Sequence, residues 1–149
     1  MFEGMDDAQV PGYRIYLTAG DYDLEIRTVT VGESRKKVPF VGVEFLVVGS
    51  NNPAHPVGST ANWTELGDKD GWLGRVRGFL HAVVQNDGPC TVNEITTDVA
   101  KALTADAGEK IRGYRVRAIV TDAVTQKGKT VTRHAWFPSG KPEAKSATA

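Results

Sequence analysis

Residues 110–133 carry seven basic side chains against one acid, which gives this stretch a net charge of +6. The basic residues are Lys110, Arg112, Arg115, Arg117, Lys127, Lys129 and Arg133, and the acid is Asp122. Since the whole chain has 18 basic and 18 acidic residues, the remaining positions are net −6. A fixed row of cations displaces counterions from phosphates, so this pattern favours a surface for a polyanion. The alternative is that the cations protect strand edges from unwanted pairing.

Aromatic rings are interleaved with cations along the chain, which is the second requirement for holding an unpaired nucleic-acid strand. Each exposed base gains about 1 to 3 kcal/mol by stacking on such a ring. For every ring the alternative role is core filling. The candidate nucleic-acid-binding residues are Arg27, Arg35, Lys36, Lys37, Phe40, Trp63, Arg115, Arg117, Lys127, Lys129, Arg133, His134 and Trp136.

Five strands and two helices are expected to position these side chains. Alternating apolar residues predict strands at 22–31, 38–48, 57–66, 110–121 and 130–137, with Arg115 and Arg117 opposite the apolar face of the fourth. On the last strand we expect an inward set of Val131, Ala135 and Phe137 and an outward set of Thr132, His134 and Trp136.

Helical spacing replaces the alternation in the middle of the chain. A helix is expected from an N-cap at Asp70 to about Asp87, with one apolar face formed by Trp72, Val76, Phe79, Leu80 and Val83. A second helix is expected from residues 91–93 to Gly108, because Thr91 and Glu94 have capping-box spacing. Its apolar face consists of Ile95, Val99 and Leu103.

Three strands, a helical insertion and two further strands follow the order of an OB-fold, a five-stranded, partly open barrel with its helix between strands three and four. An unrelated α+β sandwich is the alternative for the same order of elements. We expect flexible ends at 1–10 and 139–149 and one domain at 11–138. In an OB-fold the basic turns at Ser34–Lys37 and Gln126–Lys129 flank one groove, whereas as solvated hairpin tips they have no such role.

Several segments resemble phage-encoded OB-type single-stranded-DNA-binding proteins and a related phage domain family found among replication genes. The similar segments are Gly20–Ile26, Val38–Phe45, Gly74–Leu80 and Gly128–Pro138. The resemblance implies sequence-tolerant binding of single-stranded DNA in phage replication or recombination, with replication or recombination proteins and a second copy of the chain as further partners. The near-neutral segment 141–149 differs from the acidic tail that recruits partners in many such proteins.

Catalytic and metal-binding patterns are not found in the sequence. The histidines His55, His81 and His134 are far apart, Cys90 is the single cysteine, and neither a zinc spacing nor a phosphate-binding glycine loop occurs. The acids Asp21, Asp23, Glu25 and Glu44 are expected on outer strand faces without partners. We therefore expect no enzyme activity, no metal and no cofactor.

A single cysteine, short apolar runs and the lack of a signal-like N-terminus indicate a protein of the host cytoplasm without membrane contact. The alternative to DNA binding is a phage structural or adaptor protein that uses the barrel as a protein-interaction platform and pairs the basic stretch 110–133 with an acidic partner.

Overall fold

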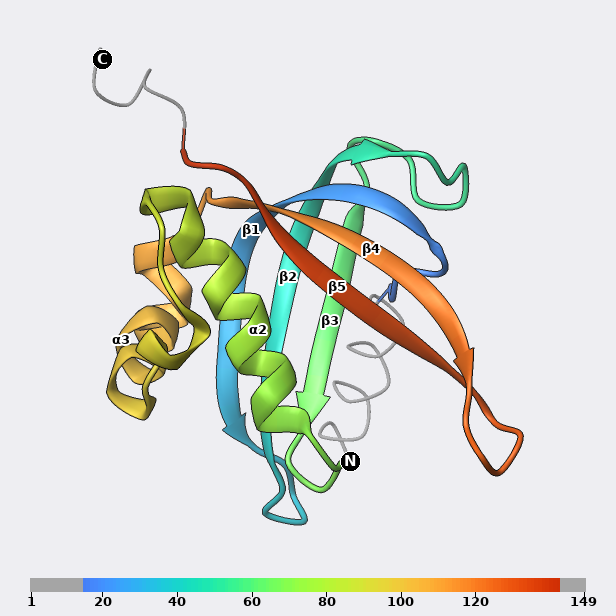
Figure 1. The fold of residues 1–149 in the computed structure, drawn as a ribbon, viewed down its shortest axis with the longest axis horizontal. Coiled ribbons are helices and arrows are strands. Elements are labelled where there is room, and N and C mark those ends of the chain that lie inside the picture. Colours follow the sequence, from blue (N-terminus) through green and yellow to red (C-terminus); the bar gives the residue numbers. More distant parts are fainter. Residues whose placement is uncertain (1–14, 143–149) are drawn as a thin grey trace, which may run out of the picture.

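The computed structural model describes residues 15–142, which form a mostly β fold with one five-stranded antiparallel sheet and two α-helices (Figure 1). The strands are β1 (Gly20–Glu33), β2 (Pro39–Ser50), β3 (Thr60–Leu66), β4 (Arg115–Val124) and β5 (Thr130–Gly140). Their order across the sheet is β3-β2-β1-β4-β5, and no pairing joins β3 to β5 among the described residues. The sheet is therefore not closed into a barrel.

β1 is the central strand, and it bends because its register with β2 is interrupted twice. One interruption leaves Arg27 without a partner opposite it, so Ile26 and Val29 both face the core although three positions separate them. The Arg112 guanidinium donates from Nε to the Arg27 carbonyl at 3.0 Å, which occupies the bulge oxygen. Only the first part of β1, from Gly20 to Glu25, pairs with β4.

The helix α2 (Trp72–Val84) packs on the inner face of the sheet, with its contacts mainly to β5, β3 and β4. Val76, Phe79, Leu80 and Val83 are buried, as the helical spacing predicts, and Trp72 packs against the core. The expected N-cap at Asp70 is wrong. Gly71 occupies that position with φ 78°, because the left-handed turn out of β3 requires a positive φ that glycine adopts without strain.

The helix α3 (Thr97–Gly108) packs against β1 and begins later than the sequence pattern predicts. Residues Val92–Glu94 form a 3-10 turn instead, and the expected capping box at Thr91 makes no side-chain cap. The Thr96 hydroxyl caps the helix by accepting from the Val99 amide at 3.3 Å, so the true start lies five residues beyond Thr91.

Two strands also start later than expected. The fourth begins at Arg115 because Glu109–Ile111 form a 3-10 turn that buries Ile111, and the third begins at Thr60. The last strand runs to Gly140, so Ser139 and Gly140 belong to the sheet. The expected flexible N-terminal segment 1–10 and residues 143–149 of the expected tail lie outside the described residues. Neither α-helix within residues 15–142 has the length and apolar character that a membrane crossing requires.

From His134 to Phe137 the facing of β5 is the reverse of the sequence prediction. His134 and Trp136 face the core and are half-buried, whereas Ala135 and Phe137 face solvent. The register explains this, because Trp136 lies opposite Ala118 and His134 opposite Val120, and directly paired residues share one face. Ala118 and Val120 are buried, so their partners on β5 point inward as well. A shift of one residue exchanges the two faces of a strand.

The packing of α3 on β1 gives a stability prediction at Gly108. This residue has φ 77°, and an added Cβ would lie 2.6 Å from Cγ2 of Val29. Gly128 has a similar φ of 79° with no atom within 4 Å. We expect Gly128→Ala to lower the free energy of unfolding by about 1 kcal/mol and Gly108→Ala to lower it by at least about 1 kcal/mol more. Urea unfolding of the two variants measures the difference, and equal losses would contradict the close helix–strand contact.

Candidate nucleic-acid interface

A cleft of about 1230 Å³ lies where the sheet is open, between the edges of β3 and β5 and beside the first half of α2. β3 supplies Trp63, Thr64 and Glu65 to its walls, and Tyr16 and Leu17 extend that side. The opposite side consists of Thr125 and the β5 residues Val131, Thr132, Arg133, His134 and Trp136. The cleft therefore replaces the strand pairing that would close the sheet.

Aromatic rings span the base of this cleft from one sheet edge to the other. Trp63 of β3 and Trp136 of β5 contact each other with ring centroids 4.9 Å apart, and Phe79 of α2 lies 5.1 Å from Trp63 and 5.0 Å from Trp136. Such edge-to-face and tilted pairs stabilise a core beyond their buried area. Trp63 is only 4 % exposed, so it supports the base of the cleft and offers almost no surface to a ligand.

His134 and Trp136 form the part of this cluster that a ligand can reach. Their rings stack with centroids 5.3 Å apart and planes 15° from parallel, and both side chains are half-buried. Burial lowers the pKa of His134 to about 4, because the charged imidazolium is poorly solvated there. His134 is therefore neutral at physiological pH, and together with Trp136 it provides a flat, uncharged aromatic surface.

Charged side chains line the rim of the cleft, with Lys69, Arg75 and Arg133 against Glu65 and Asp70. The Arg75 Nε atom donates to both oxygens of the buried Glu65 carboxylate at 2.9 Å. Its Nη1 atom donates to the Asp70 carbonyl at 2.8 Å, so the guanidinium is fixed beside the opening. The rim is weakly positive, and Lys69 and Arg133 are its cations outside this ion pair.

Three of the expected DNA-binding arginines lie elsewhere, on the outer face of the sheet. Arg117 forms an ion pair with Asp21, and Arg27 and Arg115 both contact Glu25, at 3.1 and 3.5 Å. The expectation that Asp21 and Glu25 lack partners is therefore wrong, and Asp23 accepts a hydrogen bond from the Ser139 hydroxyl at 2.8 Å. Cross-strand pairing of β1 with β4 places these opposite charges together, which neutralises two of the seven cations in residues 110–133.

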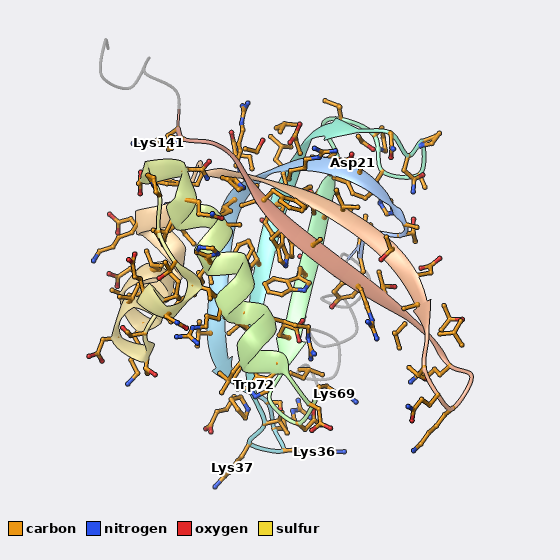
Figure 2. All side chains as sticks on the ribbon, viewed as in Figure 1. Asp21, Lys36, Lys37, Lys69, Trp72 and Lys141 are labelled. Carbon is orange, nitrogen blue, oxygen red and sulfur yellow. The ribbon has the colours of Figure 1, made fainter. Side chains whose placement is uncertain are left out.

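The β1–β2 turn projects beside the β3–α2 connection, whereas the β4–β5 turn projects separately at the lower right (Figure 1). Lys36 and Lys37 point outward at the tip of the β1–β2 turn, with Lys69 on the neighbouring connection (Figure 2). Lys127 and Lys129 lie in the β4–β5 turn, beyond the Thr125 side of the cleft. Arg35 also belongs to the β1–β2 turn, and Phe40 lies on the outer face at the start of β2.

Comparison with known proteins adds no relative. No family model matches the chain, and no curated protein matches it. Function is therefore inferred from the geometry of residues 15–142. Within that part of the chain no group of three or more His, Cys, Asp or Glu side chains is placed to hold a metal ion.

The cleft contains residues that were not among the expected nucleic-acid-binding residues. Lys69, Arg75 and the glycines Gly74 and Gly78 line it from the α2 side. The sequence held one relevant signal, because two glycines four positions apart inside a helix weaken it without an evident structural reason. Of the expected nucleic-acid-binding residues, only Trp63, Arg133, His134 and Trp136 line the cleft.

Proposed function

We propose that this protein binds single-stranded DNA in the cleft between β3 and β5. The observation that carries this proposal is the neutral, stacked His134–Trp136 pair beside a rim with cations on both sides. Unpaired bases gain by stacking on such rings, and phosphates gain from nearby cations. A duplex hides its base faces, so the site favours single strands.

The fold supports the same proposal. The strand order β3-β2-β1-β4-β5 is that of an OB barrel opened between its third and fifth strands, and we infer that the protein is an OB-fold of this open kind. A long bent β1 shared by both halves of the sheet also fits that class. In this arrangement Lys36, Lys37, Lys127 and Lys129 extend the positive track beyond the cleft. The resemblance to phage single-strand binders favours a role in replication or recombination.

The first test is a titration of the purified full chain with a fluorescent oligo-dT and with its duplex counterpart, at low and moderate salt. We expect preference for the single strand, quenching of tryptophan fluorescence and a log-log salt slope of about −2 to −4, since each phosphate contact contributes about 0.7. No binding at low salt would reject the proposal and favour a phage adaptor that binds an acidic protein.

Two cations, Lys69 at the rim of the cleft and Arg117 on the outer face, distinguish these two surfaces. Lys69→Gln removes a rim cation outside the Arg75–Glu65 ion pair, so we expect about a three- to tenfold loss of affinity at low salt and a salt slope shallower by about 0.7. Arg117→Gln removes an arginine already paired with Asp21. We expect its affinity to stay within about twofold of the wild type by the same anisotropy titration. A loss in Arg117→Gln with unchanged affinity in Lys69→Gln would place the strand on the outer face.

A further inference from the structure

A second hollow lies on the outer face of the sheet, around the β3 edge from the cleft. Its volume is about 240 Å³, and its floor is Gly42 in the middle of β2. The hollow arises because Gly42 lies between Thr30 of β1 and Thr64 of β3 and has no side chain. The walls are Thr28, Thr30, Phe40, Glu44, Asn62 and Thr64.

The fold does not require glycine at this position. Gly42 has no positive φ, and an added Cβ would make an ordinary contact of 3.8 Å with the Thr64 hydroxyl oxygen. Glycine weakens a strand interior, and one common reason to keep it is the close approach of a ligand. The missing side chain thus costs stability and leaves a space of ligand size.

The side chains that line the hollow determine which kind of ligand it can bind. Glu44 is exposed and is the single charged residue among those lining the hollow, and within residues 15–142 its carboxylate makes no hydrogen bond or ion pair. A carboxylate repels phosphate and accepts from N–H donors. Phe40 supplies an aromatic ring at one end, because Gly32 opposite it lets the ring approach the backbone of β1. The hollow therefore fits a flat ring that carries amino hydrogens.

Thr64 connects this hollow to the cleft, because it lines both. The Tyr16 hydroxyl lies 3.4 Å from the Thr64 hydroxyl at that point. A strand that leaves the cleft past this Tyr16–Thr64 contact reaches the hollow around the edge of β3.

We propose that the Gly42 hollow binds one base of the strand and selects, through Glu44, bases with an exocyclic amino group over thymine and uracil. This inference rests on the proposed function, since a base reaches the hollow only when the DNA strand is bound in the cleft. Cytosine offers its N4 amino hydrogens to the Glu44 carboxylate, whereas uracil and thymine present the O4 acceptor, which the carboxylate repels. The protein thus has a base preference.

The test compares oligo-dC with oligo-dU of equal length by anisotropy at slightly alkaline pH, with oligo-dT to assess the methyl group. Wild-type protein is expected to bind oligo-dC at least about fivefold more tightly than oligo-dU. In Glu44→Gln the ratio is expected to fall to within about twofold, because a carboxamide also donates to O4. In Gly42→Val the hollow is filled, so the ratio disappears while binding in the cleft remains.

Asp122→Asn is the matched control, because it removes a carboxylate from an exposed site on β4 outside the hollow. We expect it to leave the oligo-dC to oligo-dU ratio unchanged. Equal wild-type affinities for the two oligonucleotides would overturn the inference and leave the proposed function intact, as would a ratio that Glu44→Gln does not alter. Absence of binding to every oligonucleotide at low salt would overturn the proposed function itself.

Discussion

The double variant Gly74→Ala/Gly78→Ala is expected to be more stable than the wild type and to bind single-stranded DNA at least about tenfold more weakly. Both glycines lie within α2 and line the cleft, and an added Cβ at either would meet no atom within 4 Å. Each replacement gains about 0.5 to 1 kcal/mol, since alanine favours a helix more than glycine does. The two methyl groups project into open space, which in this place is the cleft.

The double variant is expected to gain stability and to lose affinity, so a loss of binding cannot be explained by unfolding. Urea unfolding measures the gain in stability, and oligo-dT anisotropy measures the loss of binding. Leu73→Ala is the matched control, because Leu73 is on the same helix, is 65 % exposed and does not line the cleft. The control is expected to leave affinity unchanged. A stabilised double variant with full affinity would show that no ligand approaches this wall.

The sequence predicted the elements of the fold well because their apolar periodicity is regular. Alternation in β2 holds for Val41, Val43, Phe45 and Val47, all of which are buried, and the helical face of α2 is equally clear. Starts and ends were less predictable. The cap at Thr96 and the left-handed Gly71 depend on how the chain leaves the preceding turn, which periodicity does not record.

The candidate site was harder to predict because it depends on register and on pairing between distant strands. The order of side chains along β5 alternates equally well in either facing, and only pairing with β4 decides that Trp136 points inward. In the same way, the basic stretch 110–133 loses part of its charge once Arg115 and Arg117 meet Glu25 and Asp21 across the sheet. Whether a cation lies at the cleft or on the outer face depends on the folded positions of its neighbours, which the composition does not give.

His134 is expected to make the domain less stable as the pH falls from about 6.5 to about 4. Burial lowers the pKa of His134 to about 4 in the folded protein, whereas an unfolded chain has an ordinary histidine pKa near 6.5. Between these two values the unfolded state binds a proton that the folded state does not, so the free energy of unfolding decreases with falling pH. The full shift corresponds to about 3 kcal/mol, and the contribution is fully present above a pH of about 6.5.

His134→Phe separates this contribution from other titrating groups, since phenylalanine keeps a ring against Trp136 and carries no proton. The carboxyl group of Asp21 also has a shifted pKa, which the hydrogen bond from Arg117 lowers below its ordinary 3.8. Asp21 therefore loses its stabilising effect only at a pH below the range in which His134 titrates in the unfolded chain. Urea unfolding at several pH values between about 4 and 8 is therefore expected to give a flatter profile for the variant than for the wild type. Parallel profiles would mean that His134 is as well solvated in the folded protein as in the unfolded chain, and the neutral stacking surface of the cleft would then have no basis.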